Sequence, residues 1–187
     1  TIDFTGLLDR GAIASARIEE DGKEWTPEGD VYTKYGYVEL NRVDIEWMRG
    51  KIINGKSELY HTILHEIGHV LGIGTLWRDN DLVVDVSGDS GVDETFYTGP
   101  KAFEEYKTIF DEFPFASDAS AIGIPIEDDG GEGTAGVHLE EGHVGYVGYE
   151  DWTNGKLSAH GSKQDRWHKG LFYPGLDQET MTGWAES

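Results

Sequence analysis

Apolar residues recur at three- and four-residue steps between positions 57 and 72, and this spacing predicts an amphipathic helix. The repeating positions are Leu59, Ile63, Ile67, Val70 and Leu71. Ser57 before them is a favourable N-cap, and Gly72 after them is a favourable left-handed C-cap. Because the apolar run is dense, we expect this helix to be held inside the protein rather than on its rim.

A second helical pattern begins at Gly99-Pro100, where proline occupies the first helical position. Its apolar face comprises Ala102, Phe103, Tyr106, Ile109, Phe110 and Phe113. This spacing places these side chains on one side of a helix. We interpret the stripe as part of the hydrophobic core.

The remaining patterns indicate a mixture of strands, short helices and loops. The aromatic and β-branched run VYTKYGYVEL at residues 31–40 predicts a strand. A helix is expected within residues 1–20, a short helix around residues 43–49, and a loop at the Asn-Gly pair 54–55. Residues 120–161 are rich in glycine and are expected to be mostly irregular. This mixture predicts an α+β fold class.

The composition narrows the classes of partner. Acidic residues outnumber basic ones by 36 to 15, and the net charge of −21 disfavours binding to nucleic acid or anionic membrane. No apolar run approaches membrane-spanning length, so we expect no membrane insertion, and no N-terminal signal pattern is visible in the chain. Cysteine is absent, which excludes disulfides and thiolate metal sites and leaves histidine and carboxylate ligands.

Calcium is a secondary candidate, because hard cations bind clustered carboxylates. One cluster lies in a glycine-containing loop and comprises Asp79, Asn80, Asp81, Asp85, Asp89 and Asp93. A weaker candidate comprises Asp128, Asp129 and Glu132. The first cluster lacks the EF-hand spacing, and an ordinary, highly soluble acidic surface is the competing interpretation.

The stretch His65-Glu66-Ile67-Gly68-His69 carries the most specific chemistry. It spells H-E-x-x-H, in which two histidines lie one turn apart on one helix face and can bind one metal ion. Zinc is expected, because it suits imidazole and has no redox chemistry. Glu66 would accept a proton from the water that the ion activates. The competing interpretation is a surface helix with solvated histidines and a salt-bridging glutamate.

A catalytic zinc ion needs a third protein ligand and an open position for water. Gly72 matches the longer pattern H-E-x-x-H-x-x-G-x-x-H, but the last position is Thr75, and a threonine hydroxyl is a poor zinc ligand. The third ligand must therefore come from elsewhere. The other histidines are His61, His138, His143, His160 and His168. Three ligands from one straight helix do not converge on one ion, so His61 is disfavoured and the later histidines stay open.

Several stretches together resemble the leishmanolysin-like metzincins, a family of zinc peptidases. HEIGHVLGIGTLW at 65–77 resembles the family's active-site helix, in which an insertion after the glycine displaces the third histidine. The other matching pieces, in the family's order, are GYVELNRVDIEWM at 36–48, GPKAFEEY at 99–106, IPIEDDGGEGTAGVH at 124–138 and ETMTGW at 179–184. The resemblance covers about residues 31–138 and 177–185.

The resemblance implies a metzincin-like zincin fold, with a twisted sheet, an active-site helix and an irregular C-terminal part. It implies one catalytic domain over residues 1–187, with an upper lobe at about 1–74 and a lower lobe with insertions at about 75–187. It also implies that the strand at 35–40 lies along the cleft and pairs with an extended peptide, with Gly36, Tyr37 and Val38 at the rim.

Carried over to this sequence, the family pattern assigns His65, His69 and His138 as zinc ligands. Glu66 would be the general base, and Met181 would lie beneath the metal in the family's Met-turn. These roles are what the resemblance implies, and they define the candidate site.

The sequence departs from the family pattern after the third histidine. Leu139 follows it where the family usually has tryptophan, and residues 139–180 separate it from Met181. The disulfides of eukaryotic members are missing, which indicates a bacterial-type member, and little sequence follows the Met-turn. His168 is the rival third ligand, and the insertion at 139–176 is open as a lid, a specificity loop, a self-inhibiting segment or a packed surface excursion.

The predicted function is a zinc-dependent endopeptidase that acts on protein or peptide substrates and is secreted or lies on the cell surface. The alternative is a non-catalytic extracellular module that keeps a metal for stability and binds a glycan, calcium or a protein. Glu66 favours the enzyme, because a structural site needs no base and is usually closed by a fourth ligand. Cleavage specificity and oligomeric state are left open.

Overall fold

The computed structural model describes residues 2–3, 12–87, 93–127, 133–140 and 167–176. It is a mixed α/β protein with small sheets, which agrees with the predicted α+β class. The chain divides into two compact units, residues 1–80 and 81–187. The single catalytic domain with lobes meeting near residue 74 stays a prediction. Among the described residues, no helix has the length and apolar character needed to span a membrane.

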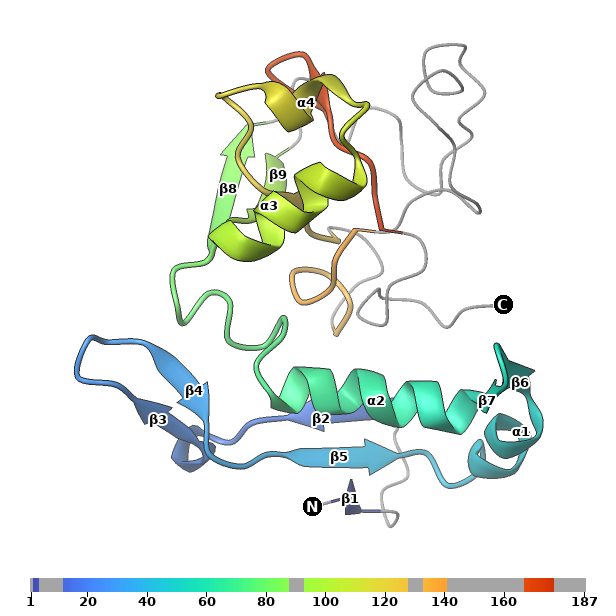
Figure 1. Ribbon diagram of the computed structural model, residues 1–187. Coiled ribbons are helices and arrows are strands. Elements are labelled where there is room, and N and C mark those ends of the chain that lie inside the picture. The colour runs from blue at the N-terminus through green and yellow to red at the C-terminus, as the bar shows by residue number, and fades with distance from the viewer. Residues whose placement is uncertain (1, 4–11, 88–92, 128–132, 141–166, 177–187) are drawn as a thin grey trace. The chain divides into compact units, whose positions relative to one another are not determined.

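The first unit contains a three-stranded sheet in the order β1-β5-β2 (Figure 1). β1 (Ile2–Asp3) runs parallel to β5 (Tyr37–Leu40), and β2 (Ala14–Arg17) runs antiparallel to β5 on its other side. Alternate residues of β5, Val38 and Leu40, are buried, whereas those between them are half-buried. This period of two gives the sheet one core-facing side.

Helix α2 (Glu58–Val70) lies along this sheet, against β2 and β5 (Figure 1). Its C-terminal end comes close to the backbone at Gly36, where a Cβ atom would lie 2.8 Å from the Arg17 carbonyl oxygen and 3.0 Å from Val70 Cγ1. A larger residue at position 36 would therefore push the helix away from the sheet. Helix α1 (Ile45–Gly50) packs against α2 as well and confirms the short helix predicted in this region.

A tight hairpin leads into α2. β6 (Ile52–Ile53) pairs with β7 (Lys56–Ser57) across the Asn-Gly pair. Both turn residues have positive φ, 49° at Asn54 and 79° at Gly55, as the type I′ turn requires. The loop predicted at these two residues is confirmed.

The run at residues 31–40 forms two strands rather than the single strand predicted. β4 (Val31–Thr33) pairs with β3 (Lys23–Trp25) in a hairpin, and β5 begins only after a gap. In that gap, the N–H groups of the next two residues donate to the carbonyl oxygen of Gly22, at the end of the 3-10 helix η1 (Glu20–Gly22). Because these two N–H groups bond to η1, they do not pair with a strand, and the run divides into β4 and β5.

The helix predicted within residues 1–20 is wrong for the part that the structure describes. Ala14–Arg17 form β2, and the N–H of Asn41 donates to the carbonyl oxygen of Ile13 just before this strand. Pairing with β5 therefore outweighs the helix propensity of the two alanines. Residues 4–11 lie outside the described residues.

The second unit is built on a three-stranded antiparallel sheet in the order β10-β9-β8. Its strands are β8 (Val83–Ser87), β9 (Asp93–Tyr97) and β10 (Ile124–Pro125). A separate hairpin pairs β11 (Trp167–His168) with β12 (Leu171–Phe172).

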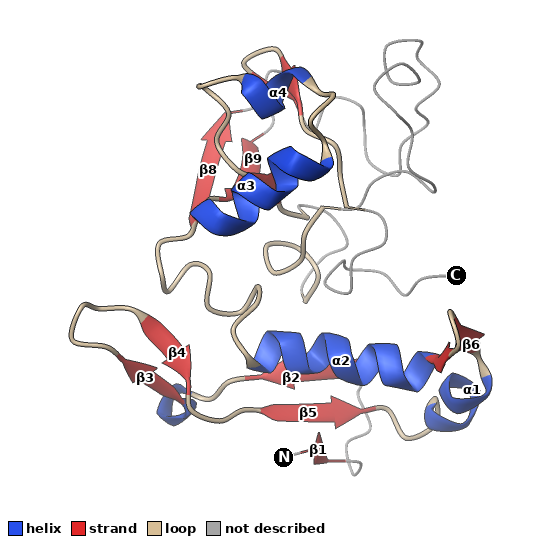
Figure 2. Ribbon diagram, viewed as in Figure 1, coloured by secondary structure: helices blue, strands red, loops and turns tan. Residues whose placement is uncertain are grey.

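Aromatic side chains form the core of the second unit. Figure 2 shows its two helices, α3 (Pro100–Ile109) and α4 (Pro114–Ser117), together with β8 and β9. The buried core comprises Phe96, Tyr106, Phe110, Phe113, Phe115, Ile124, Leu171, Tyr173 and Leu176. The aromatic members of the stripe predicted for α3 lie in or against this core, whereas Ile109 is exposed where the helix ends.

Candidate metal centre

Both ends of α2 are capped as predicted. The Ser57 hydroxyl oxygen accepts the N–H of Tyr60 at 3.2 Å, which makes Ser57 the N-cap. At the other end, Gly72 has φ +102°, and its N–H donates to the His69 carbonyl oxygen at 3.0 Å. The N–H of Ile73 donates to the carbonyl oxygen four residues before Gly72, also at 3.0 Å, which completes a Schellman motif. The helix therefore ends at a defined point directly after the H-E-x-x-H residues.

The polarity of α2 is the reverse of an ordinary amphipathic helix. Its buried positions are Glu58, Thr62, Glu66, Gly68 and His69. The exposed apolar positions on the helix and its C-cap are Tyr60, Leu64, Ile67 and Leu71. The prediction that the apolar repeat would be buried is therefore wrong for Ile67 and Leu71. Burying polar side chains costs free energy unless they are hydrogen-bonded or bind an ion, so these buried polar positions need partners.

His65 and His69 lie side by side on that helix. Their Nε2 atoms are 3.0 Å apart, and their rings are nearly perpendicular, at 84°. Two nitrogens bound to one tetrahedral zinc ion at about 2.0–2.1 Å lie about 3.3 Å from each other. The observed separation therefore suits two ligands of one ion, and the predicted pairing of these two histidines is confirmed in its geometry.

The ring orientation of His69 is set by the turn that follows α2. Its Nδ1 atom lies 2.9 Å from the carbonyl oxygen of Ile73. A carbonyl oxygen only accepts, so Nδ1 carries the hydrogen and Nε2 carries the lone pair. Metal-binding histidines in proteins usually have this second hydrogen bond, which fixes the tautomer.

Glu66 lies between the two histidines in the chain, and its side chain is only 6% exposed. Burial raises the pKa of its carboxyl group from the ordinary value of 4.5 to about 7. A carboxyl group with a pKa near neutrality can both accept and return a proton at physiological pH, which is what a general base needs.

His138 belongs to the second unit and has the same hydrogen bonding as His69. Its side chain is 4% exposed, and its Nδ1 lies 2.8 Å from the carbonyl oxygen of Thr134. It follows a turn at residues 133–137 and precedes a β-bridge: Leu139 pairs with Ile126, and the N–H of Glu127 donates to the His138 carbonyl oxygen. The ring therefore presents Nε2 as its ligand atom, as His69 does.

Three histidines of the described residues could hold a metal ion as a group: His65, His69 and His138. Each offers one ring nitrogen, and two of the three are buried. Imidazole nitrogen is a ligand that zinc, copper, iron and nickel accept, whereas calcium and magnesium prefer oxygen. The donor set therefore fits a transition metal such as the zinc ion expected from the sequence.

His61 is the other histidine whose side chain the structure describes, and it does not belong to this set. His61 lies on α2, but its Nε2 is 3.2 Å from the carbonyl oxygen of Ile53, so it ties the helix to the β6–β7 hairpin. The backbone of His168 is in β11, but its side chain lies outside the described residues. His143, His160 and Met181 also lie outside them.

Three described members of the acidic stretch expected to bind calcium have protein partners. Asp79 pairs with Lys23, the Asn80 side chain binds the backbone of Val31, and Asp85 accepts the Thr95 hydroxyl at 2.9 Å. None of these described carboxylates belongs to the group of side chains that could hold a metal ion, and calcium binding by the whole stretch stays a prediction. The positions outside the described side chains are Asp89, Asp93, Asp128, Asp129 and Glu132.

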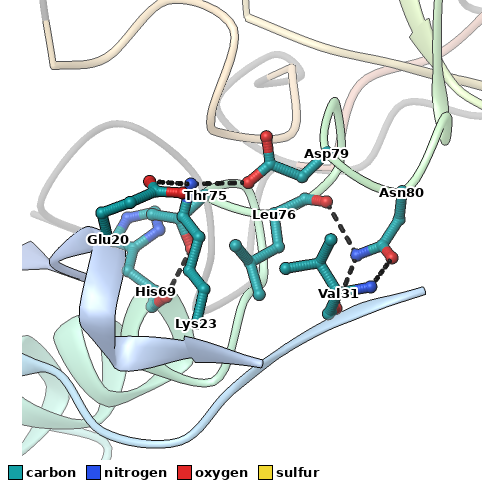
Figure 3. Close-up of polar contacts among 8 residues, drawn as sticks. All are labelled: Glu20, Lys23, Val31, His69, Thr75, Leu76, Asp79 and Asn80. Atoms are coloured by element: carbon teal, nitrogen blue, oxygen red, sulfur yellow. Dashed lines mark hydrogen bonds and ion pairs between the residues drawn. The ribbon is translucent and has the colours of Figure 1, made fainter. Parts of the chain in front are cut away.

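A polar network that sequence reasoning missed holds the segment after α2 (Figure 3). The Val31 N–H donates to Asn80 Oδ1 at 2.6 Å, and Asn80 Nδ2 donates to the Val31 carbonyl oxygen at 2.9 Å. Lys23 Nζ lies 2.8 Å from Asp79 Oδ2 and 3.4 Å from Glu20 Oε2. The hydrogen bond to Asp79 raises the pKa of Lys23. The sequence spacing does not predict these contacts, since Asp79 and Asn80 bind residues of the β3–β4 hairpin, which is distant in sequence.

The strand expected at the rim of the cleft lies instead in the middle of its sheet. β5, which contains Tyr37 and Val38, pairs with β1 on one side and β2 on the other. Its backbone groups are therefore used within the sheet. β2 is the strand next to β5 that also contacts α2, and no further strand pairs with it among the described residues.

Comparisons with known proteins give no relative. No protein-family model matches the chain, and no curated protein and no solved structure matches it. The resemblance to the leishmanolysin-like metzincins therefore stays a prediction from the sequence.

Proposed function

We propose that this protein is a zinc-dependent endopeptidase. The observation that carries the proposal is the His65–His69 pair, whose Nε2 atoms lie 3.0 Å apart, together with the buried carboxyl group of Glu66, the residue after His65 in the chain. A perturbed acid–base group next to two potential metal ligands is typical of hydrolytic metal sites. A purely structural metal site has no use for such a group.

Three nitrogen ligands, His65, His69 and His138, would hold the ion in this proposal. Catalytic zinc sites have three protein ligands and leave one position for water or substrate, whereas structural sites are closed by four. The hydrogen bonds from Nδ1 of His69 and His138 to backbone carbonyl oxygens support this role, because they orient both rings toward binding through Nε2.

Glu66 would perform the proton transfers of the reaction. Zinc, when bound, supplies a Lewis acid that polarises a carbonyl group and makes water a stronger acid. Glu66 would accept a proton from the attacking water, whose oxygen bonds to the peptide carbonyl carbon. As the carbon–nitrogen bond breaks, the same carboxyl group would deliver that proton to the leaving amine nitrogen. The pKa of Glu66, raised by burial to about 7, suits both transfers near neutral pH.

The metzincin-like fold and a secreted or cell-surface location are part of the same proposal and rest on the sequence resemblance. One structural feature supports the fold: the helix with the H-E-x-x-H residues runs along a sheet whose strand β2 is antiparallel to its neighbour. An extended peptide substrate could add to an edge strand through main-chain hydrogen bonds. We assign that role to β2 in place of the central strand β5.

A digestion assay with casein or gelatin tests the proposal. The protein should cleave these substrates, a chelator should stop the cleavage, and zinc should restore it. Glu66→Gln should retain the metal while turnover falls by a factor of about 100–10,000. Glu105→Gln makes the same chemical change at an exposed position of α3 and should leave both the bound metal and the turnover unchanged. Full activity of the Glu66 variant would refute the proposal, and a bound metal without any hydrolysis would favour the non-catalytic module.

A further inference from the structure

Thr75 occupies the position at which the pattern H-E-x-x-H-x-x-G-x-x-H has its third histidine, and its hydroxyl group has a defined contact. Thr75 Oγ1 donates to the carbonyl oxygen of His69 at 2.5 Å (Figure 3). The same carbonyl oxygen also accepts the N–H of Gly72. The backbone of the second histidine is therefore held by donors from the residues that follow it, and Thr75 supplies the side-chain donor.

The same turn orients the imidazole ring of His69. Its Nδ1–H donates to the carbonyl oxygen of Ile73, at 2.9 Å. Ile73 lies between Gly72 and Gly74, which have φ values of +102° and +79°. Left-handed glycines on both sides of Ile73 make this stretch adaptable, because glycine adopts most backbone conformations at little cost. The position of the Ile73 carbonyl group therefore depends on the hydrogen bonds that hold the turn.

The backbone of the turn is held by the N–H of Ile73, which donates to the Gly68 carbonyl oxygen at 3.0 Å, and its side-chain anchors lie after the second glycine. Thr75 is the first of them, and it ties the turn directly to His69. Further along, Asn80 Nδ2 donates to the carbonyl oxygens of Leu76 and Val31, at 3.0 and 2.9 Å. These bonds fasten the end of the segment to the β3–β4 hairpin (Figure 3). The hydroxyl group of Thr75 is the side-chain anchor nearest to Ile73 in the chain.

We propose that Thr75 is a positioning residue for His69. Its hydroxyl group closes the turn so that the Ile73 carbonyl oxygen meets Nδ1–H, and this bond keeps Nε2 in the form that binds a metal. The inference rests on the proposed function and adds to it a role for the position that has lost its histidine. Thr75 supports the second ligand instead of supplying the third.

Two measurements on the full chain test this role. In the metal-free protein, at a pH above the ordinary histidine pKa of about 6.5, side-chain nitrogen NMR should find His69 as the Nδ1–H tautomer. In Thr75→Val the two tautomers should mix, and zinc affinity, measured by chelator competition, should fall by about 10–100-fold. Thr75→Ser, which keeps the hydroxyl group, should restore both readouts.

Thr108→Val is the matched control. Thr108 Oγ1 also donates to a helix carbonyl oxygen, that of Glu104, at 3.0 Å, but it lies in α3. This variant should change neither readout. The inference is overturned if Thr75→Val keeps the wild-type tautomer and affinity, or if Thr108→Val loses affinity equally. Should Thr75→Val fail to fold, Thr75→Ala is measured in its place, since it removes the hydroxyl group without a branched side chain.

The tautomer measurement separates this inference from the proposed function. A wild-type protein that binds no zinc would remove the peptidase proposal. If the wild-type protein binds zinc and Thr75→Val keeps the same His69 tautomer, the peptidase proposal stays intact and only the positioning role is removed.

Discussion

The imidazole of His138 donates its Nδ1 hydrogen to the carbonyl oxygen of Thr134 at 2.8 Å. His69 makes the same kind of bond, at 2.9 Å, to a residue four positions after it, whereas Thr134 lies four positions before His138. Two histidines from separate units thus have the same tautomer fixed by backbone acceptors. Histidines that bind one ion through Nε2 are expected to have their tautomers fixed in this way.

His138→Ala should therefore abolish metal binding. Loss of a direct ligand should weaken zinc affinity by more than the factor of about 10–100 typical of its hydrogen-bond partners. Chelator competition and elemental analysis of the purified protein would measure this. His61→Ala is the control, because His61 bonds to the Ile53 carbonyl oxygen and should not contribute a ligand. Full zinc content in the His138 variant, with loss in His168→Ala, would transfer the third position to His168.

Gly72→Ala should destabilise the first unit. The residue has φ +102°, and an added Cβ atom would lie 3.0 Å from Leu76 Cδ1 and 3.3 Å from Leu76 Cβ. Backbone strain and crowding together should lower the free energy of unfolding by about 1–2 kcal/mol, measured by urea denaturation. Gly50→Ala is the control, since no heavy atom lies within 4 Å of the Cβ it would add and its φ is not positive. A neutral result at position 72 would show that the Schellman end does not need glycine.

Local signals in the sequence were sufficient for the elements that depend on neighbouring residues. Ser57 and Gly72 mark the two ends of α2, and the Asn54-Gly55 pair marks its type I′ turn, because caps and turns are made by residues close in sequence. The pairing of His65 with His69 follows from helix geometry in the same way.

Tertiary pairing decided the features that the sequence did not predict. The Ala14–Arg17 segment became a strand because β5 pairs with it, and β5 lies in the middle of the sheet because β1 pairs with its other side. The contacts of Asn80 with Val31 depend on residues far apart in the chain. Neither propensity nor periodicity contains this information.

Burial along α2 is the clearest case in which the repeat of apolar residues gave a wrong prediction. The apolar repeat predicted a buried face, yet Leu71 is 70% exposed while Glu66 and His69 are buried. A hydrophobic pattern identifies a helix, but it does not identify which face meets the core when that face carries polar groups for a metal site.

The difference in burial between Met48 of α1 and Leu71 at the end of α2 predicts an unequal response to two truncations. Met48→Ala should lower the free energy of unfolding by about 2–5 kcal/mol, because Met48 is fully buried and its sulfur lies 3.7 Å from the Thr62 hydroxyl on α2. Leu71→Ala should change it by less than about 0.5 kcal/mol, since that side chain is largely in solvent. Chemical denaturation of both variants would measure the difference, and a large cost at Leu71 would mean that its side chain is covered in solution.

The last prediction concerns the stability of the second unit at alkaline pH. Tyr173 is fully buried, and its hydroxyl oxygen accepts the N–H of Ile122 at 3.3 Å. Burial raises the pKa of Tyr173 to about 12, above the value of about 10 for tyrosine in an unfolded chain. The folded state therefore holds this proton more tightly, so its contribution to stability is complete below pH ~10 and is lost as the pH rises through ~12.

Tyr173→Phe removes the titrating group and keeps the ring that packs against Phe96 and Phe115. The difference in unfolding free energy between wild type and variant should therefore shift by about 1 kcal/mol against the wild type between pH ~9 and ~11. Urea denaturation at the two pH values measures it. A difference that stays constant would mean that the Tyr173 hydroxyl group is reached by water in the folded protein, since burial is the main cause that separates its folded and unfolded pKa values.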